Sequence, residues 1–231
     1  ARTIFPVDSG YIGQTGIVKG TALDAAPGRV DRVEVRISSG NSPRWYFNGT
    51  DWVTTEETWL TTTLSANGTF WWYPASPWVT NQSFRSESRV YDRSGRREVA
   101  YSTVNFNADF TVPLSTALHP HFNSDFELDI TSVEARASDA PPGSVSLVEF
   151  SYYKVTPPSG YWDRAAGNWG SVPELFYPAA PVGGDKFRAT AGSTPTWVTT
   201  AGGITYRVFA RVTDQAGNVN NKPDNPGANT Q

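Results

Sequence analysis

Short segments in which apolar and polar residues alternate recur along the whole chain. Residues 32–37 read RVEVRI, residues 125–130 read DFELDI, and residues 205–212 read TYRVFARV. Strict alternation with a period of two is typical of β-strands that bury one face. No segment offers a capped run of helical length with a period of 3.6 residues. The pattern therefore predicts an all-β protein built from short strands.

Turn residues lie between these strands. Asn48-Gly49 separates RWYF from TDWV, and Asn67-Gly68 separates TTTLSA from TFWWY. Because Asn-Gly accepts positive φ at both central positions, each pair predicts a two-residue hairpin of type I′. Proline and glycine follow Asp24 and Asp139 in the sequences AAPG and APPG, and they predict matching corners between strands.

The sequence contains an internal repeat. With a shift of 115 positions, DAAPGRVDRVEV (24–35) aligns with DAPPGSVSLVEF (139–150), and seven of the 12 positions are identical. With a shift of 122, FRSESRVYDRSG (84–95) aligns with YRVFARVTDQAG (206–217), and five of the 12 are identical. The two collinear matches indicate a tandem duplication with seven extra residues inside the second copy. We predict domains 1–108 and 109–231, joined by a short polar linker that ends at Pro113.

Each copy has the features of a small β-sandwich. About seven short strands in ~110 residues, with turns at regular spacing, favour a sandwich of the immunoglobulin type. Both copies end with the phrase Arg-Val-x-Asp-x-x-Gly. We expect the side chains of Asp92 and Asp214 to form hydrogen bonds with the backbone two residues further along the chain. Gly95 and Gly217 should supply the left-handed backbone conformation that reverses the direction of the chain.

The order of these features resembles the tandem immunoglobulin-like modules of large secreted and surface proteins of bacteria. The matching positions in the first copy are Gly20, Ala22, Asp24, Val33–Val35, Tyr46–Gly49, Trp52, Arg89, Val90, Asp92 and Gly95. Those in the second copy are Ala137, Asp139, Val148–Phe150, Tyr161, Trp162, Trp169 and Arg211–Asn218. The first copy departs from the pattern at Arg96, where the second has Asn218. The resemblance implies an extracellular or cell-surface location and a role as spacer, adhesin or filament building block.

Composition excludes several other functions. The formal net charge is -3 and the pI is about 5.4, which argues against nucleic acid or an anionic membrane as partner. No apolar run approaches the ~18 residues of a membrane span. The chain has no cysteine, and its two histidines, His119 and His121, accompany no G-x-S-x-G motif. We therefore predict no catalytic residues, no enzymatic activity and no cofactor.

The sequence favours calcium over a metal bound by His119 and His121, which could share one strand face but equally fit a polar segment near the linker. Calcium binds oxygen atoms from Asp, Glu, Asn and backbone carbonyls, and tandem sandwich modules can place such ligands where they join. The chain has no D-x-D-x-D-G loop, so these residues equally fit turns and a soluble surface. The candidate ligands are Asp8, Asp92, Asn107, Asp109, Asp125, Glu127 and Asp129.

Tryptophan is concentrated in the first copy, which holds six of the nine in the chain. Successive side chains of a strand point to opposite faces, so Trp71 and Trp72 cannot both enter one core. We predict that Trp71, Trp72 and Trp78 contact a partner protein or a glycan, or that other parts of the chain cover them. The sequons at Asn48, Asn67 and Asn81 permit N-glycosylation, although Asn-Gly turns explain two of them.

Together these observations predict a non-catalytic extracellular structural module that serves as a stalk, an adhesin segment or a filament subunit. Its partners would be other copies of itself or flanking modules, arranged head-to-tail. Two other functions stay open. The chain could be a carbohydrate-binding module that uses exposed tryptophans, or an accessory domain of a secreted enzyme.

Overall fold

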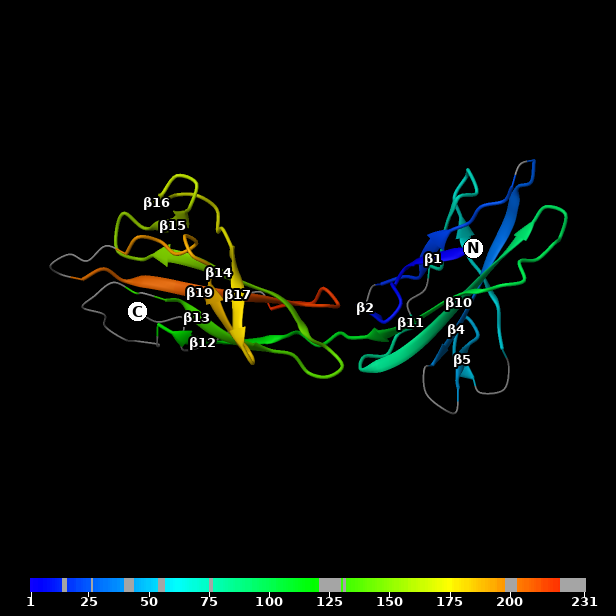
Figure 1. Ribbon diagram of the computed structural model, residues 1–231, viewed down its shortest axis with the longest axis horizontal. Coiled ribbons are helices and arrows are strands. Elements are labelled where there is room, and N and C mark those ends of the chain that lie inside the picture. Colours follow the sequence, from blue (N-terminus) through cyan, green and yellow to red (C-terminus); the bar gives the residue numbers. More distant parts are fainter. Residues whose placement is uncertain are drawn as a thin grey trace. The chain divides into compact units, whose positions relative to one another are not determined.

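The computed structural model describes residues 1–13, 16–25, 27–39, 44–53, 57–74, 77–120, 130, 132–197 and 203–220. These residues form strands, turns and loops without any helix, so the chain is all-β (Figure 1). It divides into two compact units, Ala1–Phe110 (unit 1) and Thr111–Gln231 (unit 2). No helix that could cross a lipid bilayer is present in the described residues.

Unit 1 is a β-sandwich of the immunoglobulin type. One sheet has the order β1-β3-β9-β8, and the other has the order β2-β11-β10-β4-β5-β6, with β7 paired to β4. The strands are β1 (Arg2–Phe5), β2 (Gly10–Ile12), β3 (Lys19–Thr21), β4 (Val30–Ser39), β5 (Tyr46–Phe47), β6 (Trp52–Val53), β7 (Leu60–Thr61), β8 (Thr63–Leu64), β9 (Phe70–Trp72), β10 (Gln82–Asp92) and β11 (Ser102–Ala108).

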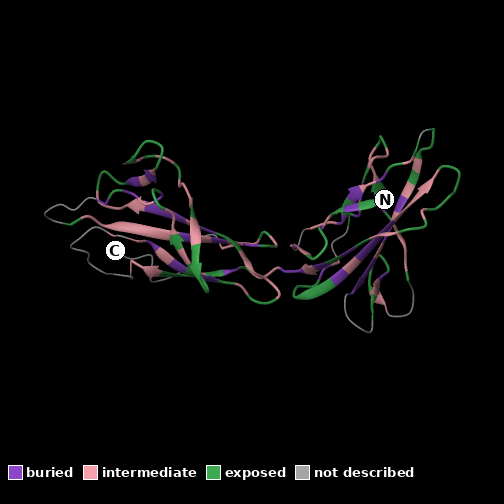
Figure 2. Cartoon of the chain, viewed as in Figure 1, coloured by how far each residue is buried: buried purple, intermediate pink, exposed green. Residues whose placement is uncertain are grey.

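The core of unit 1 lies between its two sheets. Trp71 comes from the smaller sheet, and Val33 and Phe84 come from the larger one, and all three are buried in one apolar cluster. From Arg32 to Ile37 on β4, buried residues alternate with partly exposed ones, as the period-two pattern predicts (Figure 2). Gly20 on β3 makes room for the indole of Trp71, because a Cβ atom at Gly20 would lie 2.5 Å from the Trp71 ring.

Unit 2 is a second sandwich in which one strand joins the two sheets. Strand β17 pairs with β18 along one part of its length and with β14 along another, so the strand order is β12-β13-β18-β17-β14-β15-β16, with β19 and β20 beside β14. The strands are β12 (Leu114–His119), β13 (Glu134–Ser138), β14 (Val145–Lys154), β15 (Gly160–Asp163), β16 (Asn168–Gly170), β17 (Tyr177–Gly183), β18 (Lys186–Ala189), β19 (Tyr206–Asp214) and β20 (Val219–Asn220).

The central strand pair has the same register in both units. In unit 1, β4 pairs with β10 so that Val33 lies opposite Val90. In unit 2, β14 pairs with β19 so that Val148 lies opposite Val212, which are the repeat equivalents of those two residues. In both pairs the register also shifts next to the aspartate that ends the second strand. The described residues contain eleven strands in unit 1 and nine in unit 2, more than the roughly seven expected, because several strands are only two residues long.

The repeated terminal phrase forms the same turn in both units. The amides of Gly95 and Gly217 donate to the carbonyls of Asp92 and Asp214, and both glycines have positive φ, at 82° and 87°. Each aspartate carboxylate accepts a backbone N–H four residues on, at 2.8 Å, and the carboxylate of Asp92 also bonds the hydroxyl and the backbone of Ser94, two residues on. The left-handed glycine is therefore confirmed, and each aspartate side chain helps to close the turn.

The two Asn-Gly segments form hairpins, but not of type I′. Phe47 pairs with Trp52 and Leu64 pairs with Trp71, so four or more residues lie between the paired positions. Gly49 and Gly68 have positive φ and the asparagines before them do not. The type I′ prediction is wrong because each asparagine side chain closes a longer loop by accepting backbone N–H groups.

Candidate functional site

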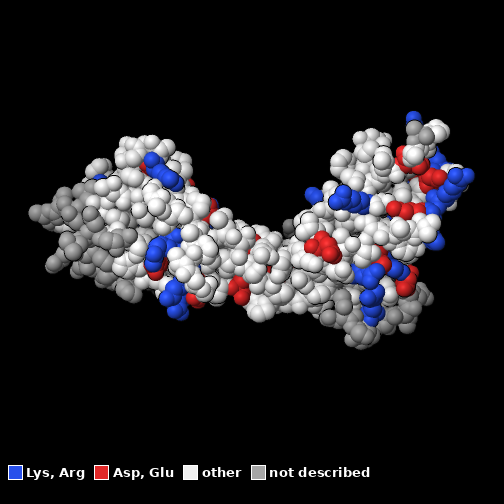
Figure 3. Space-filling model, viewed as in Figure 1, with Lys and Arg blue, Asp and Glu red and all other residues white. Residues whose placement is uncertain are grey.

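The outer face of β4 and β10 carries alternating charges in complementary register. Arg36 on β4 lies opposite Glu87 on β10, and Glu34 lies opposite Arg89. Opposite charges directly across an antiparallel pair stabilise the sheet. We call this set of residues the charged ladder; it comprises Arg32, Glu34, Arg36, Arg85, Glu87 and Arg89. In the view of Figure 3 basic and acidic side chains are interspersed over unit 1, so they form no patch of a single sign there.

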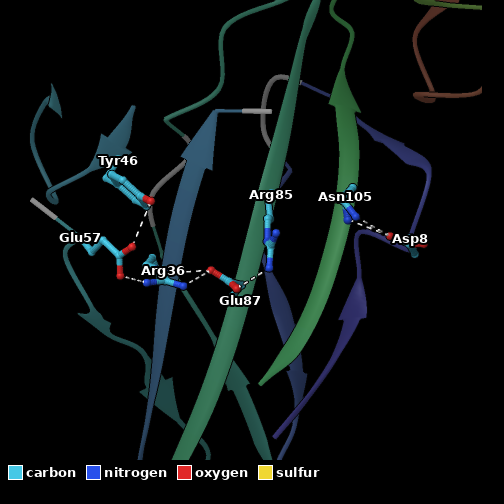
Figure 4. Close-up of polar contacts among 7 residues, drawn as sticks. All are labelled: Asp8, Arg36, Tyr46, Glu57, Arg85, Glu87 and Asn105. Atoms are coloured by element: carbon cyan, nitrogen blue, oxygen red, sulfur yellow. Dashed lines mark hydrogen bonds and ion pairs between the residues drawn. The ribbon is translucent and has the colours of Figure 1, made fainter. Parts of the chain in front are cut away.

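Glu87 is the centre of the charged ladder. Its carboxylate accepts hydrogen bonds from Arg36 Nε at 2.8 Å and from Arg85 Nη2 at 2.7 Å (Figure 4). The residue is only 4% exposed, so its charge depends on these two guanidinium groups rather than on water. Arg36 also pairs with Glu57, whose other oxygen accepts a hydrogen bond from the Tyr46 hydroxyl at 3.2 Å.

Aromatic rings stack on the arginines of the ladder. Trp59 lies beside two guanidinium groups, with Arg89 at 3.8 Å and Arg36 at 4.9 Å from its ring. Arg32 stacks on Tyr91 at 3.7 Å. Each such cation–π contact contributes about 0.5–1 kcal/mol where it is partly solvated.

Glu34 is stabilised in its charged form. Burial raises its pKa, but the hydrogen bonds from Arg89 and Arg32 outweigh this effect, so the pKa of the Glu34 carboxyl lies below its usual range. A carboxyl whose pKa is lower in the folded state stabilises the fold above its unfolded pKa. That contribution is lost as the pH falls through the folded value.

Only one rung of the ladder is repeated in unit 2. Arg211 donates two hydrogen bonds to Glu149, at 2.9 and 2.7 Å, and stacks on Phe176 at 3.7 Å. Glu149 and Arg211 are the repeat equivalents of Glu34 and Arg89. The ion pair with its stacked ring is thus common to both units, whereas the rest of the ladder belongs to unit 1.

A second group of contacts ties the second strand of unit 1 to its last strand. Strand β2 pairs in parallel with the end of β11. Asp8, two residues before the start of β2, accepts a hydrogen bond from the backbone N–H of Asn105 at 2.8 Å (Figure 4). The amide of Ser9 donates to the Asn105 carbonyl at 2.6 Å, and the amide of Asp109 donates to the Ile12 carbonyl at 3.1 Å. We call this pairing of residues 8–12 with 105–109 the strand clamp.

The calcium candidates of unit 1 have separate structural roles. Asp8 belongs to the strand clamp, and Asn107 accepts a hydrogen bond from Ser83 at 2.7 Å. Asp109 is fully buried at the end of the unit. Asp92 closes its turn, where the Ser94 hydroxyl and the Arg96 amide lower its pKa. Within the described part of unit 1, no three Asp, Glu, His or Cys residues bring ligand atoms within 4.8 Å of one another.

The remaining calcium candidates, Asp125, Glu127 and Asp129, lie outside the described residues, as does His121. In unit 2 the structure instead brings together Asp139 and Asp214, whose carboxylate oxygens lie within 4.8 Å of each other. Asp214 is 2% exposed and accepts hydrogen bonds from the backbone and side-chain nitrogens of Asn218. The side-chain Nδ2 of Asn218 also donates to the carbonyl of Thr111, at 3.2 Å.

The predicted tryptophan contacts need a correction. Trp71 and Trp78 are buried in the core of unit 1, and their indole N–H groups donate to the carbonyls of Thr21 and Gly16. They are not available to a partner or a glycan, because their rings fill the space between the sheets. Trp72 is partly exposed on the opposite face of β9, together with Phe70, which is 52% exposed.

Sequence reasoning missed the charged ladder. The signal was present in two segments, RVEVR at 32–36 and RSESR at 85–89, each of which has the order Arg, Glu, Arg on one face. Antiparallel pairing of two such strands sets each glutamate opposite an arginine. Trp59 gave no comparable signal, since it precedes a two-residue strand and reaches the ladder only through the tertiary fold.

Comparison with known proteins identifies no family for this chain. No protein-family model matches the chain, and none of the curated proteins has significant sequence similarity. Among solved structures, the chain is similar to the fibronectin(III)-like modules of Clostridium thermocellum CbhA. The TM-score is 0.44 at 12% sequence identity, over 96% of this chain and 89% of that one.

Proposed function

We propose that this chain is a non-catalytic structural module of an extracellular or cell-surface protein, a spacer that carries tension. The strand clamp is the observation that carries this proposal. Strands β2 and β11 lie near the two ends of unit 1 and run parallel to each other. When the unit is pulled from both ends, parallel strands must slide past each other, which loads their hydrogen bonds together rather than one after another.

The charged ladder supports the same role. Its charged groups pair with one another across β4 and β10 instead of converging on a cleft. The ion pairs Arg36–Glu87 and Arg89–Glu34 add side-chain cross-links to the longest strand pair of the unit. Unit 2 repeats the central strand pair, the closing turn and one ion pair, as expected if both copies serve as units of one spacer.

A second function, carbohydrate binding, is favoured by one specific feature. On the outer face of the smaller sheet of unit 1, Trp72 lies opposite Lys19, whose ammonium group lies 5.6 Å from the ring of Phe5. Exposed Phe70 lies on the same face, since it is two residues from Trp72 on β9. Aromatic side chains of this kind can stack on sugar rings.

Titration with soluble polysaccharides separates the two functions. For a spacer we expect no change in tryptophan fluorescence with neutral, acidic or sulfated polysaccharides. A saturable change that disappears in Trp72→Ala would contradict the spacer role and support binding through the outer face of β9. The variant Trp45→Ala is a suitable control, because Trp45 is also exposed, at 44%, but belongs to the segment before β5 in the other sheet.

A further inference from the structure

We propose that Asn48 is a site of spontaneous covalent modification, namely intramolecular deamidation, and that the fold protects the second Asn-Gly site, Asn67. In this reaction the backbone nitrogen of the following glycine attacks Cγ of the asparagine and loses its proton to hydroxide or another base. The Cγ–Nδ2 bond breaks, ammonia leaves and a five-membered succinimide forms. Water then opens the succinimide to aspartate or isoaspartate.

At both sites hydrogen-bond donors are directed at the side-chain carbonyl of the asparagine, which is the electrophile. The Oδ1 atom of Asn48 accepts hydrogen bonds from the backbone N–H groups of Thr50 at 2.9 Å and Asp51 at 2.8 Å. The Oδ1 atom of Asn67 accepts from the Thr69 amide at 3.2 Å and from the hydroxyls of Ser65 and Thr69. Donors directed at this oxygen stabilise the negative charge that develops on it when Cγ is attacked.

The nucleophile differs between the two sites. The amide of Gly68 donates to the Ser65 carbonyl at 2.8 Å, so this hydrogen bond must break before the nitrogen can attack Asn67. The amide of Gly49 has no hydrogen-bond acceptor among the described residues, and Asn48, Gly49 and Thr50 are all exposed. Both glycines lack a side chain that would hinder closure of the ring. The free amide therefore makes Asn48 the faster site.

The modification has a structural consequence because the loop holds two core residues. Phe47 and Trp52 pair on either side of the loop, and their rings pack at 5.6 Å in the core of unit 1. Isoaspartate inserts one more carbon into the backbone, and aspartate adds a negative charge to a chain whose net charge is already -3. Either product alters a hairpin that is fixed by the Asn48 side chain.

The test compares both sites within one molecule. The full chain is incubated in mildly alkaline buffer, and the products at Asn48 and Asn67 are quantified over time by peptide mapping and mass spectrometry. In the folded chain we expect Asn48 to react about threefold to tenfold faster than Asn67, the factor that one net hydrogen bond is worth. In concentrated urea the two rates should converge, because the Gly68–Ser65 hydrogen bond is absent there.

Two results would overturn the proposal. One is a folded chain in which Asn67 reacts as fast as Asn48 or faster. The other is a folded chain in which Asn48 does not react while the urea-denatured chain does. The urea sample controls for differences in intrinsic reactivity, since both asparagines precede glycine and are followed by the same Gly-Thr sequence.

Discussion

Replacing Trp71 with alanine should destabilise unit 1 by about 4 kcal/mol, because truncating a fully buried aromatic residue removes its apolar contacts and leaves a cavity. Trp71 is 1% exposed, and its indole N–H donates to the Thr21 carbonyl at 3.1 Å. Gly20 has no side chain that could fill the space left by the indole. The loss is comparable to the whole stability of a small domain, which is about 5–15 kcal/mol.

The matched control is Trp72→Ala, one position along the same strand. Trp72 points to the outer face of β9 and is partly exposed, so its truncation should cost about 1 kcal/mol or less. Urea unfolding of the two variants, followed by circular dichroism, provides the comparison. Equal losses of stability, or a larger loss for Trp72→Ala, would show that the faces of β9 are assigned the wrong way round.

Replacing Glu87 with alanine should cost about 3 kcal/mol, since removal of the buried carboxylate leaves the mostly buried Arg36 guanidinium dependent on the exposed Glu57 carboxylate. Arg36 and Arg85 both donate to this carboxylate, and the Arg36 side chain is itself only 12% exposed. The double variant Arg36→Ala/Glu87→Ala should lose less than the sum of the two single variants, because each single variant already breaks the shared pair. Urea midpoints of the four proteins give this coupling energy.

Glu57→Ala is the control for the second prediction. Glu57 binds the same guanidinium group, but its side chain is 57% exposed, and surface ion pairs contribute about 0–1 kcal/mol. We expect it to shift the urea midpoint of unit 1 only slightly. If Glu57→Ala destabilised unit 1 as much as Glu87→Ala, burial of the ion pair would not explain how the charged ladder stabilises the unit.

The sequence predicts the fold well where pattern and repeat agree. The 115-position shift sets β4 onto β14, and the structure gives both strands the same partner and register. Alternation in 32–37 identifies Val33, Val35 and Ile37 as core residues, and all three are fully buried. These features are local, because side chains of a strand alternate whatever the rest of the chain does.

Other features depend on tertiary contacts that a local pattern does not contain. In the segment FWWY (70–73) both faces are aromatic, so the period alone cannot show that Trp71 points inward and Trp72 outward. Strand β17 pairs with both β14 and β18, and this pairing depends on how the two sheets of unit 2 come together. No turn residue in the sequence specifies it. The proximity of Asp139 to Asp214 is another such tertiary feature, since the two residues are far apart in the sequence.

Single-molecule stretching of the full chain tests the central claim, that two separately folded sandwiches carry tension. We expect two separate unfolding events, each lengthening the chain by about 300–400 Å, which is the extended length of a unit of this size. In Asp8→Ala, which loses the carboxylate that accepts from Asn105 in the strand clamp, one event should move to lower force while the other is unchanged. A single event that releases the whole length, or an Asp8→Ala chain with both events unchanged, would contradict the account.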